Sequence, residues 1–151
     1  MKRPNERDAA DSSACTEVRA VYAELARRPL DRNCVRVREC CHFKLTGRTP
    51  LLTKGEAVVA ARALRQTGRT RLPEASSGAC PMLETATGDC LIYESRPFGC
   101  RTHFCAAAGG PYPRDEVIDL IRRLEQVDTA LGGDGVHKIE EAVRNALAEL
   151  E

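Results

Sequence analysis

Seven of the eight cysteines in this 151-residue chain fall between residues 34 and 105, in irregular sequence interrupted by glycine and proline. Clustered cysteines in a protein kept in a reducing compartment more often bind metal or carry out redox chemistry than form disulfides. Buried thiols without a metal would explain only a minority of such a cluster. The candidate metal ligands are Cys34, Cys40, Cys41, Cys80, Cys90 and Cys100, with Cys105, His42 and His103 as further candidates.

The spacing of these cysteines does not match the commonest zinc modules. The chain has no CxxC knuckle, and seven thiols exceed the four ligands of one tetrahedral zinc ion. Either some thiols are spare, or the site holds more than one metal ion, or it holds an iron–sulfur cluster. The adjacent Cys40 and Cys41 are poorly placed to bond to each other, because neighbouring side chains diverge. We expect their partners in the later segments 80–90 and 100–105.

Two histidines and the remaining cysteine have less certain roles. His103 follows Cys100 by three residues, so both side chains could reach one metal ion, and His42 directly follows Cys41. A lone histidine is nevertheless more often a surface or core residue than a ligand. Cys15 stands apart from the cluster, in a segment with helical periodicity, and we expect it to be a small core or surface residue.

Three segments carry a family resemblance: CVRVRECC at 34–41, CPML at 80–83 and CLIYESRPFGCRTHF at 90–104. Together they resemble the putative zinc- or iron-chelating CxxCxxCC family, the YkgJ-like proteins. The resemblance implies metal binding by these cysteines and does not imply an established activity. A similar cysteine domain occurs in flagellin lysine methylases, where iron–sulfur binding has been suggested, and this implies a link to modification enzymes.

The chain departs from the family pattern at one position. Aligning Cys34 with the first family cysteine, and the pair 40–41 with the last two, places Val37 where the family has its second cysteine. The resemblance therefore implies that one ligand is missing from the pattern. The candidate replacements are Cys105, His42 and His103.

Two arginines flank Cys100 and suit the surroundings of a negatively charged thiolate centre. Four thiolates around Zn²⁺ or a 4Fe–4S²⁺ core leave a net negative charge, which nearby cations and hydrogen-bond donors stabilise. We expect Arg96 and Arg101 to do this, with Glu94 orienting Arg96 through a bidentate ion pair. The alternative is that Arg96 holds a phosphate or carboxylate group of a substrate.

The rest of the chain must position these side chains. Its periodicity predicts a mainly α fold (small α+β), with helices around a cysteine-rich irregular middle and one short β-hairpin. The segment TKGE at 53–56 has the form of a capping box, and Gly68 is a suitable end for the helix that it opens. Residues 1–12 are predicted to be a disordered tail, and 13–151 a single metal-binding domain. The predicted helices cover 13–28, 53–68, 117–131 and 134–150, and the predicted hairpin covers 80–94.

The composition of the chain limits which cellular compartment and which classes of binding partner are expected. Hydrophobic residues make up 42% of the chain, aromatic residues 4%, and tryptophan is absent, so a thin core would gain from cross-linking by metal. No segment has the length and apolarity of a signal peptide or a membrane span, which favours a cytoplasmic protein without a membrane partner. Residues 27–71 hold twelve Lys or Arg and three acidic residues. This basic balance suits nucleic acid, or simply offsets a cluster of thiolates.

The sequence leaves three functions open. The first is a metal-binding protein that holds an iron–sulfur cluster, iron or zinc and acts as a structural, redox or metal-handling module. The second is a metal-dependent enzyme, or an accessory of a modification enzyme such as a methyltransferase. An enzyme is less favoured, because the chain has no Gly-rich phosphate loop, nucleophile elbow or HExxH motif. The third is a nucleic-acid-binding module that uses the basic segment 27–71. The sequence does not identify a protein partner.

Overall fold

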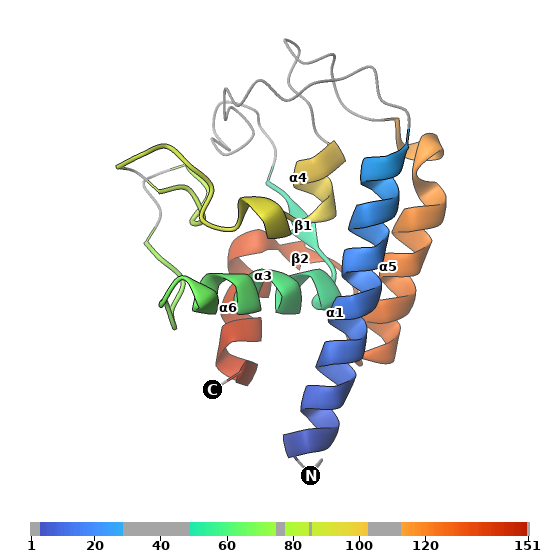
Figure 1. Ribbon diagram of the computed structural model, residues 1–151, viewed down its shortest axis with the longest axis horizontal. Helices are drawn as coiled ribbons and strands as arrows, with labels where there is room; N and C mark the ends of the chain where they lie inside the picture. The colour runs from blue at the N-terminus through green and yellow to red at the C-terminus, as the bar shows by residue number, and fades with distance from the viewer. Residues whose placement is uncertain (1–3, 29–48, 75–77, 85, 103–112, 151) are drawn as a thin grey trace.

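The computed structural model describes residues 4–28, 49–74, 78–84, 86–102 and 113–150. Within these residues the protein is mostly helical, as the sequence predicts, and its one regular sheet has two short antiparallel strands (Figure 1). The elements are α1 (Pro4–Arg27), β1 (Leu51–Leu52), α3 (Lys54–Gln66), α4 (Phe98–Thr102), α5 (Ile118–Ala130), β2 (His137–Lys138) and α6 (Ile139–Leu150), with short 3₁₀ helices at Tyr93–Ser95 and Arg114–Glu116.

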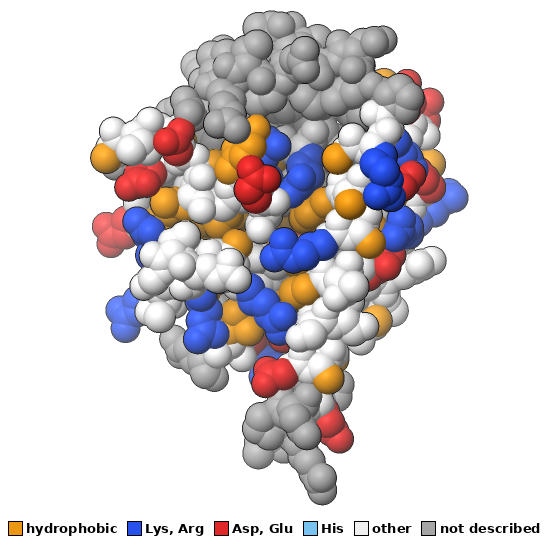
Figure 2. Space-filling model, in the orientation of Figure 1, with side chains coloured by type: hydrophobic (Ala, Val, Ile, Leu, Met, Phe, Trp, Pro, Cys, Tyr) orange, Lys and Arg blue, Asp and Glu red, His pale blue; other side chains and the backbone are white. Residues whose placement is uncertain are grey.

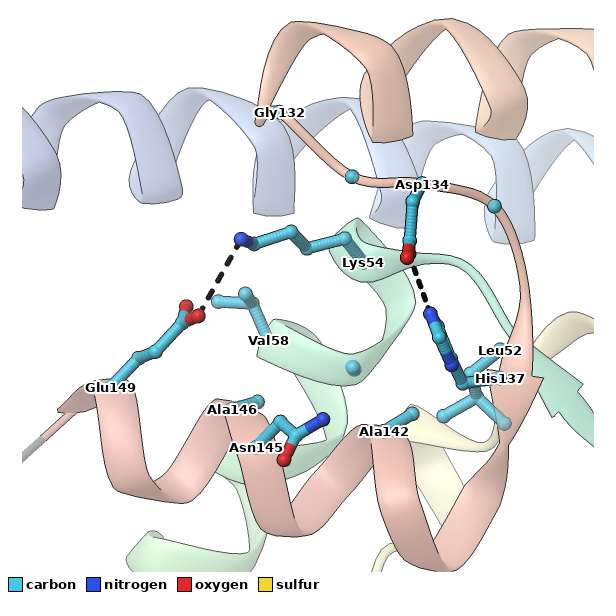
Figure 3. A pocket seen from close by; sticks show the side chains of 13 residues that line it. Leu52, Lys54, Val58, Gly132, Asp134, His137, Ala142, Asn145, Ala146 and Glu149 are labelled. Atoms are coloured by element: carbon cyan, nitrogen blue, oxygen red, sulfur yellow. Dashed lines mark hydrogen bonds and ion pairs between the residues drawn. The ribbon is translucent and has the colours of Figure 1, made fainter.

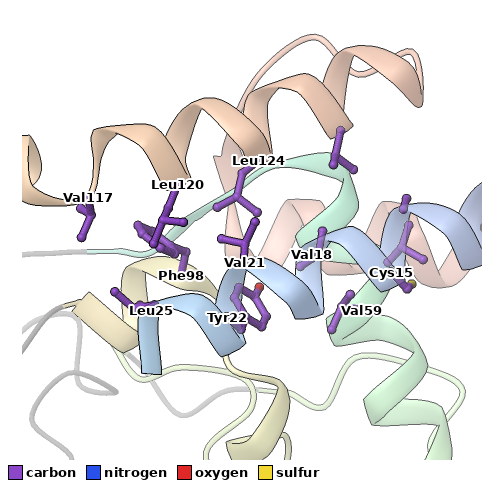
Figure 4. Close-up of a cluster of buried hydrophobic side chains, with 13 residues drawn as sticks. Cys15, Val18, Val21, Tyr22, Leu25, Val59, Phe98, Val117, Leu120 and Leu124 are labelled. Atoms are coloured by element: carbon purple, nitrogen blue, oxygen red, sulfur yellow. The ribbon is translucent and has the colours of Figure 1, made fainter. Parts of the chain in front are cut away.

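The first apolar cluster, cluster 1, fills the space between α1, α5 and one face of α3 (Figure 4). α1 and α5 lie side by side and run in opposite directions, and α3 crosses α1 (Figure 1). Burial of this apolar surface is the main force that holds the three helices together. Cluster 1 consists of Ala14, Cys15, Val18, Val21, Tyr22, Leu25, Val58, Val59, Phe98, Val117, Leu120, Leu124 and Val127.

The second apolar cluster, cluster 2, lies between the other side of α3 and α6. α3 therefore packs against both clusters. Its residues Val58 and Val59 belong to cluster 1, and its residues Ala57, Ala60 and Ala61 belong to cluster 2. The segment that precedes α4 also packs here and contributes one cysteine. Cluster 2 consists of Leu52, Ala57, Ala60, Ala61, Leu64, Cys80, Met82, Ile92, Ile139, Ala142, Val143, Ala146 and Leu147.

α1 begins at Pro4 rather than at the predicted residue 13, so residues 4–12 are helical where a disordered tail was predicted. Pro is tolerated in the first turn of a helix, where its missing N–H has no partner in any case. The negative charge of Glu6 in the first turn interacts favourably with the positive end of the helix dipole. The apolar pattern starts only at Ala14, and that is why periodicity placed the start too late.

α3 confirms the capping box at 53–56. The backbone N–H of Thr53 and its hydroxyl both donate to the Glu56 carboxylate, at 3.0 and 2.9 Å. The helix ends at Gln66, and Gly68 follows with φ of +90°, a conformation that suits glycine. Both local signals therefore placed this helix correctly.

The sheet differs from the predicted hairpin. β1 pairs with β2, with Leu51 opposite Lys138 and Leu52 opposite His137, although the two segments are far apart in the sequence. β2 occupies residues that were predicted as the first turn of the last helix, so α6 begins at Ile139. Of the predicted hairpin at 80–94, the described residues keep one antiparallel bridge, between Leu83 and Cys90.

The apolar stripe predicted for residues 117–131 is confirmed in α5 and the residue before it. Val117, Leu120 and Leu124 are buried in cluster 1, because they recur at the spacing that keeps one helix face inward. None of the described helices combines the length and the apolarity that crossing a membrane requires.

Candidate metal centre

Three of the predicted metal ligands, Cys80, Cys90 and Cys100, belong to the described residues. The described residues next to the two longest gaps, 29–48 and 103–112, lie at the same end of the molecule as α4, the upper end in Figure 1. The other candidate ligands lie outside the described residues, and so does Val37, which stands where the family has its second cysteine. The candidate ligands outside the described residues are Cys34, Cys40, Cys41, His42, His103 and Cys105.

Cys80 and Cys90 lie on opposite arms of the short bridged turn. Cys80 is buried in cluster 2, and Cys90 is half-buried against the same cluster. The backbone N–H of Leu91 donates to the carbonyl of Met82 at 2.8 Å and holds the two arms together. Both cysteines are thus anchored through apolar packing on α3 and α6.

Cys100 lies in α4, a helix of only five residues. The backbone N–H of Phe98, at the start of α4, donates to Glu56 Oε1 at 2.7 Å. The Phe98 ring is buried in cluster 1. These two contacts set the position and direction of the helix that carries Cys100.

Glu56 is the group on which three segments converge. Its carboxylate is 2% exposed and accepts four hydrogen bonds: two from Thr53, one from Phe98 N and one from the Tyr22 hydroxyl at 3.2 Å. Burial raises the pKa of Glu56, while the four donors act in the opposite direction. Because every lone-pair direction is used, Glu56 joins α1, α3 and α4 and is not placed to act as a base.

Arg101 follows Cys100 in α4 and contacts Tyr22 of α1, one of the hydrogen-bond partners of Glu56. Its guanidinium is 4.1 Å from the centre of the Tyr22 ring. Its Nε donates to the carbonyl of Arg96 at 2.7 Å and its Nη2 to the carbonyl of Glu94 at 2.8 Å. Burial lowers the pKa of Arg101, and negative charge on Tyr22 or Cys100 would raise it again. The cation is therefore held in place by main-chain carbonyls next to a thiol.

Arg96 is held in a different way from the expected one. Its Nε donates to the carbonyl of Tyr93 at 3.0 Å, and its guanidinium is 4.0 Å from the centre of the Tyr93 ring. Among the described residues no ion pair joins the Glu94 carboxylate to Arg96; Glu94 is exposed and contributes its main-chain carbonyl to Arg101. The Glu94 carbonyl that Arg101 contacts belongs to the 3₁₀ helix at 93–95.

No group of three His, Cys, Asp or Glu side chains within the described part of the chain is arranged to hold a metal ion. Cys80, Cys90 and Cys100 therefore do not form a complete site by themselves. Their chemistry still fits zinc or iron, because both metals take thiolate ligands and a cation beside a thiol favours the thiolate. A complete site would need further ligands.

The described basic residues of the segment 27–71 are largely engaged in contacts within the protein. Arg27 pairs with Glu24, and Arg28 pairs with Asp119. On the face shown in Figure 2, Lys and Arg side chains are scattered among acidic and apolar ones and do not form one stripe. This arrangement gives the nucleic-acid hypothesis no added support, and it stays a prediction.

Sequence reasoning missed the role of Glu56 beyond helix capping, and missed Tyr22 as its partner. A signal was present for Glu56, because it precedes the apolar run AVVAA at 57–61, all of which is buried. A charged residue at the edge of a fully buried helix segment needs partners from other elements. No comparable signal links Tyr22 or Phe98 to it, since they lie on distant segments.

A family model described as "CxxCxxCC: Putative zinc- or iron-chelating domain" matches residues 33–125, more than half of the chain. The matched range contains the three described candidate ligands and the Glu56 network except Tyr22. No curated protein matches the chain, and no solved structure does so either.

Proposed function

The chain belongs to the CxxCxxCC family of zinc- or iron-chelating domains, and from that premise we propose that its cysteines bind zinc or iron as thiolates. The proposed ligands are Cys34, Cys40, Cys41, Cys80, Cys90 and Cys100, with Cys105, His42 or His103 in place of the missing family cysteine. A bound metal or cluster would act as a structural cross-link and, if it is iron–sulfur, as a redox centre.

The observation that carries the proposal is the fixed position of Arg101, which follows Cys100 in α4 and interacts electrostatically with its thiol. The guanidinium stacks on a buried ring and donates to two main-chain carbonyls, so it cannot move away without breaking these contacts. A cation held next to a cysteine stabilises the thiolate, which is the form that binds metal. It would also offset the negative charge of a centre with several thiolates.

The scaffold supports the same function. Cys100 is tied to α1 and α3 through Glu56, and Cys80 and Cys90 are tied to α3 and α6 through cluster 2. A metal that joins these segments would connect both halves of the helical core. Its binding energy would then add to the stability of the fold.

The experiment that tests the proposal is metal analysis of protein purified without oxygen. Zinc without visible absorbance would identify a thiolate zinc site, whereas iron with acid-labile sulfide and brown colour would identify a cluster. Protein that holds neither metal, and takes up neither on reconstitution, would contradict the proposal. The assay also separates the two metals that the sequence left open.

A further inference from the structure

A second region has the features of a ligand site and shares no residue with the metal proposal. A pocket of about 300 Å³ lies between the first turn of α3, the loop at 132–135 and one face of α6 (Figure 3). This volume is at the lower end of the range for small-molecule sites, so it suits a ligand of a few heavy atoms.

Small apolar side chains make the floor of this pocket. Ala57 of α3 and Ala142 and Ala146 of α6 line it and are 3%, 7% and 6% exposed, and Leu52 and Val58 complete the apolar surface. Facing helices usually fill the space between them with larger side chains. Three methyl groups at this position leave a hollow that an apolar chain can enter.

The wall of the pocket is held in one conformation by the buried Asp128. Its carboxylate accepts hydrogen bonds from the backbone N–H of Lys54 at 2.8 Å and of Gly135 at 3.0 Å. A Cβ at Gly133 would clash with the same carboxylate, so this loop requires glycine there. The pocket is therefore formed before any ligand arrives, which lowers the entropic cost of binding.

The charges on the rim decide which ligand fits. Glu149 has a close cationic partner in Arg7 at 3.1 Å, and Asp134 has a close partner in His137 at 2.5 Å, which is cationic when protonated. Lys54 contacts Glu149 more loosely, with 3.5 Å between Nζ and Oε1 (Figure 3). Lys54 can thus turn to an anion while Glu149 keeps its pair with Arg7. A cationic ligand would instead compete with partners that are already close.

We propose that this pocket binds a small monocarboxylate with a short apolar chain. The carboxylate pairs with the ammonium group of Lys54, and the Asn145 amide on α6 offers a second donor at the rim (Figure 3). The chain rests on the alanine floor. Neither step depends on metal, so the proposal stands apart from the proposed metal site.

The test uses the full chain as purified and 3-methylbutanoate as the probe, with ¹⁵N–¹H spectra recorded during titration. We expect saturable shifts at the amides of Gly132, Gly133 and Gly135, with a dissociation constant of about 1 mM for a ligand of this size. The uncharged 3-methylbutanamide should bind about tenfold more weakly, because it lacks the charge that pairs with Lys54. Equal binding of the amide, or of 3-methylbutylamine, would overturn the proposal.

Variants localise the effect to the pocket. Lys54→Met should weaken binding of the acid about tenfold, while Lys138→Met, the same change on exposed β2 outside the pocket lining, should leave it unchanged. Ala142→Leu should fill the hollow and abolish binding of the acid. If Lys54→Met binds 3-methylbutanoate as the parent does, or if the glycine amides do not shift, the proposal is wrong. These outcomes do not depend on the stability of the overpacked variant.

Discussion

The segment with Cys80 and Cys90 packs on the scaffold through apolar side chains, whereas α4 with Cys100 adds to its buried Phe98 ring a hydrogen bond to a buried carboxylate. Met82 and Ile92, 1% and 3% exposed, hold the first segment against α3 and α6. Phe98 N holds the second against Glu56 at 2.7 Å. Both regions place cysteines at the edge of the helical core. Apolar packing positions the first region, and a hydrogen bond to Glu56 helps to position the second.

The difference between the two regions shows which feature of a segment, its depth or its orientation, each kind of contact can fix. Apolar burial is non-directional, so it fixes how deeply a segment lies more than how it is oriented. A hydrogen bond to a carboxylate fixes direction as well as distance. α4 has five described residues, and it carries Cys100, whose proposed role as a metal ligand would require one direction. The directional anchor is therefore found where orientation matters more.

The largest expected effect comes from removing the directional anchor. Glu56→Ala leaves the donors of Thr53, Tyr22 and Phe98 buried without an acceptor, and should lower the free energy of unfolding by about 4 kcal/mol. Urea unfolding measures the loss. Glu125→Ala, at an exposed acid of α5, is the control and should change the value by less than about 0.5 kcal/mol. Similar losses in both variants would remove Glu56 from its central role.

Removing the apolar anchor should cost slightly less. Met82→Ala deletes a side chain that is 1% exposed and should lower the free energy of unfolding by about 3 kcal/mol. Unlike the change at Glu56, it should leave the amide shifts of α4 in place, because no hydrogen bond to α4 is lost. Leu51→Ala, at a side chain that is 51% exposed, is the matched control and should have a much smaller effect. Large shifts in α4 for Met82→Ala would mean that the two anchors are not separate.

A single hydrogen bond within the Glu56 network should have a moderate effect. Tyr22→Phe removes the 3.2 Å bond to Glu56 and keeps the ring that stacks on Arg101. We expect a loss of about 1 kcal/mol in the free energy of unfolding, since Glu56 keeps three donors. A loss as large as that of Glu56→Ala would show that the tyrosine hydroxyl, and not the carboxylate, is the organising group.

The smallest effect is expected at a polar contact exposed to water, the pair of His137 and Asp134. The hydrogen bond that the His137 ring donates to the Asp134 carboxylate raises the pKa of His137, and the same contact lowers the pKa of Asp134. The pair is therefore fully charged between these two values, and its contribution fades as pH rises through the pKa of His137 or falls through that of Asp134.

An NMR titration of the His137 ring checks this direction. Asp134→Asn should lower the pKa of His137, though Glu141 remains near its Nδ1 at 3.5 Å. Asp115→Asn, in the 3₁₀ helix before α5, should leave the pKa of His137 where it is. Thermal stability should hardly change in either variant, because an exposed pair is screened by solvent. An unchanged pKa in Asp134→Asn would contradict the contact.

Sequence reasoning predicted the elements that have local signals. The capping box at 53–56 and the apolar spacing of Leu120 and Leu124 placed α3 and α5, because these signals lie within one or two helical turns. The β1–β2 pairing had no such signal, since strands of two residues carry no alternating pattern.

The candidate site was predictable in composition but not in arrangement. Cysteine type and motif resemblance pointed to metal, and the family match confirms the resemblance. Arg101 was expected beside the thiols, yet its stacking on Tyr22 joins residues from opposite parts of the chain. Such contacts depend on tertiary packing, which local patterns do not encode.

The most direct test of the central claim compares two cysteines in matched variants. Cys100→Ala removes a proposed ligand, and Cys15→Ala removes a thiol buried in cluster 1 on α1. Metal bound per chain should be stoichiometric in the parent protein and in Cys15→Ala, and should fall sharply in Cys100→Ala. Full metal content in Cys100→Ala would contradict the claim that Cys100 is a ligand, and a parent protein that binds neither zinc nor iron would contradict the account as a whole.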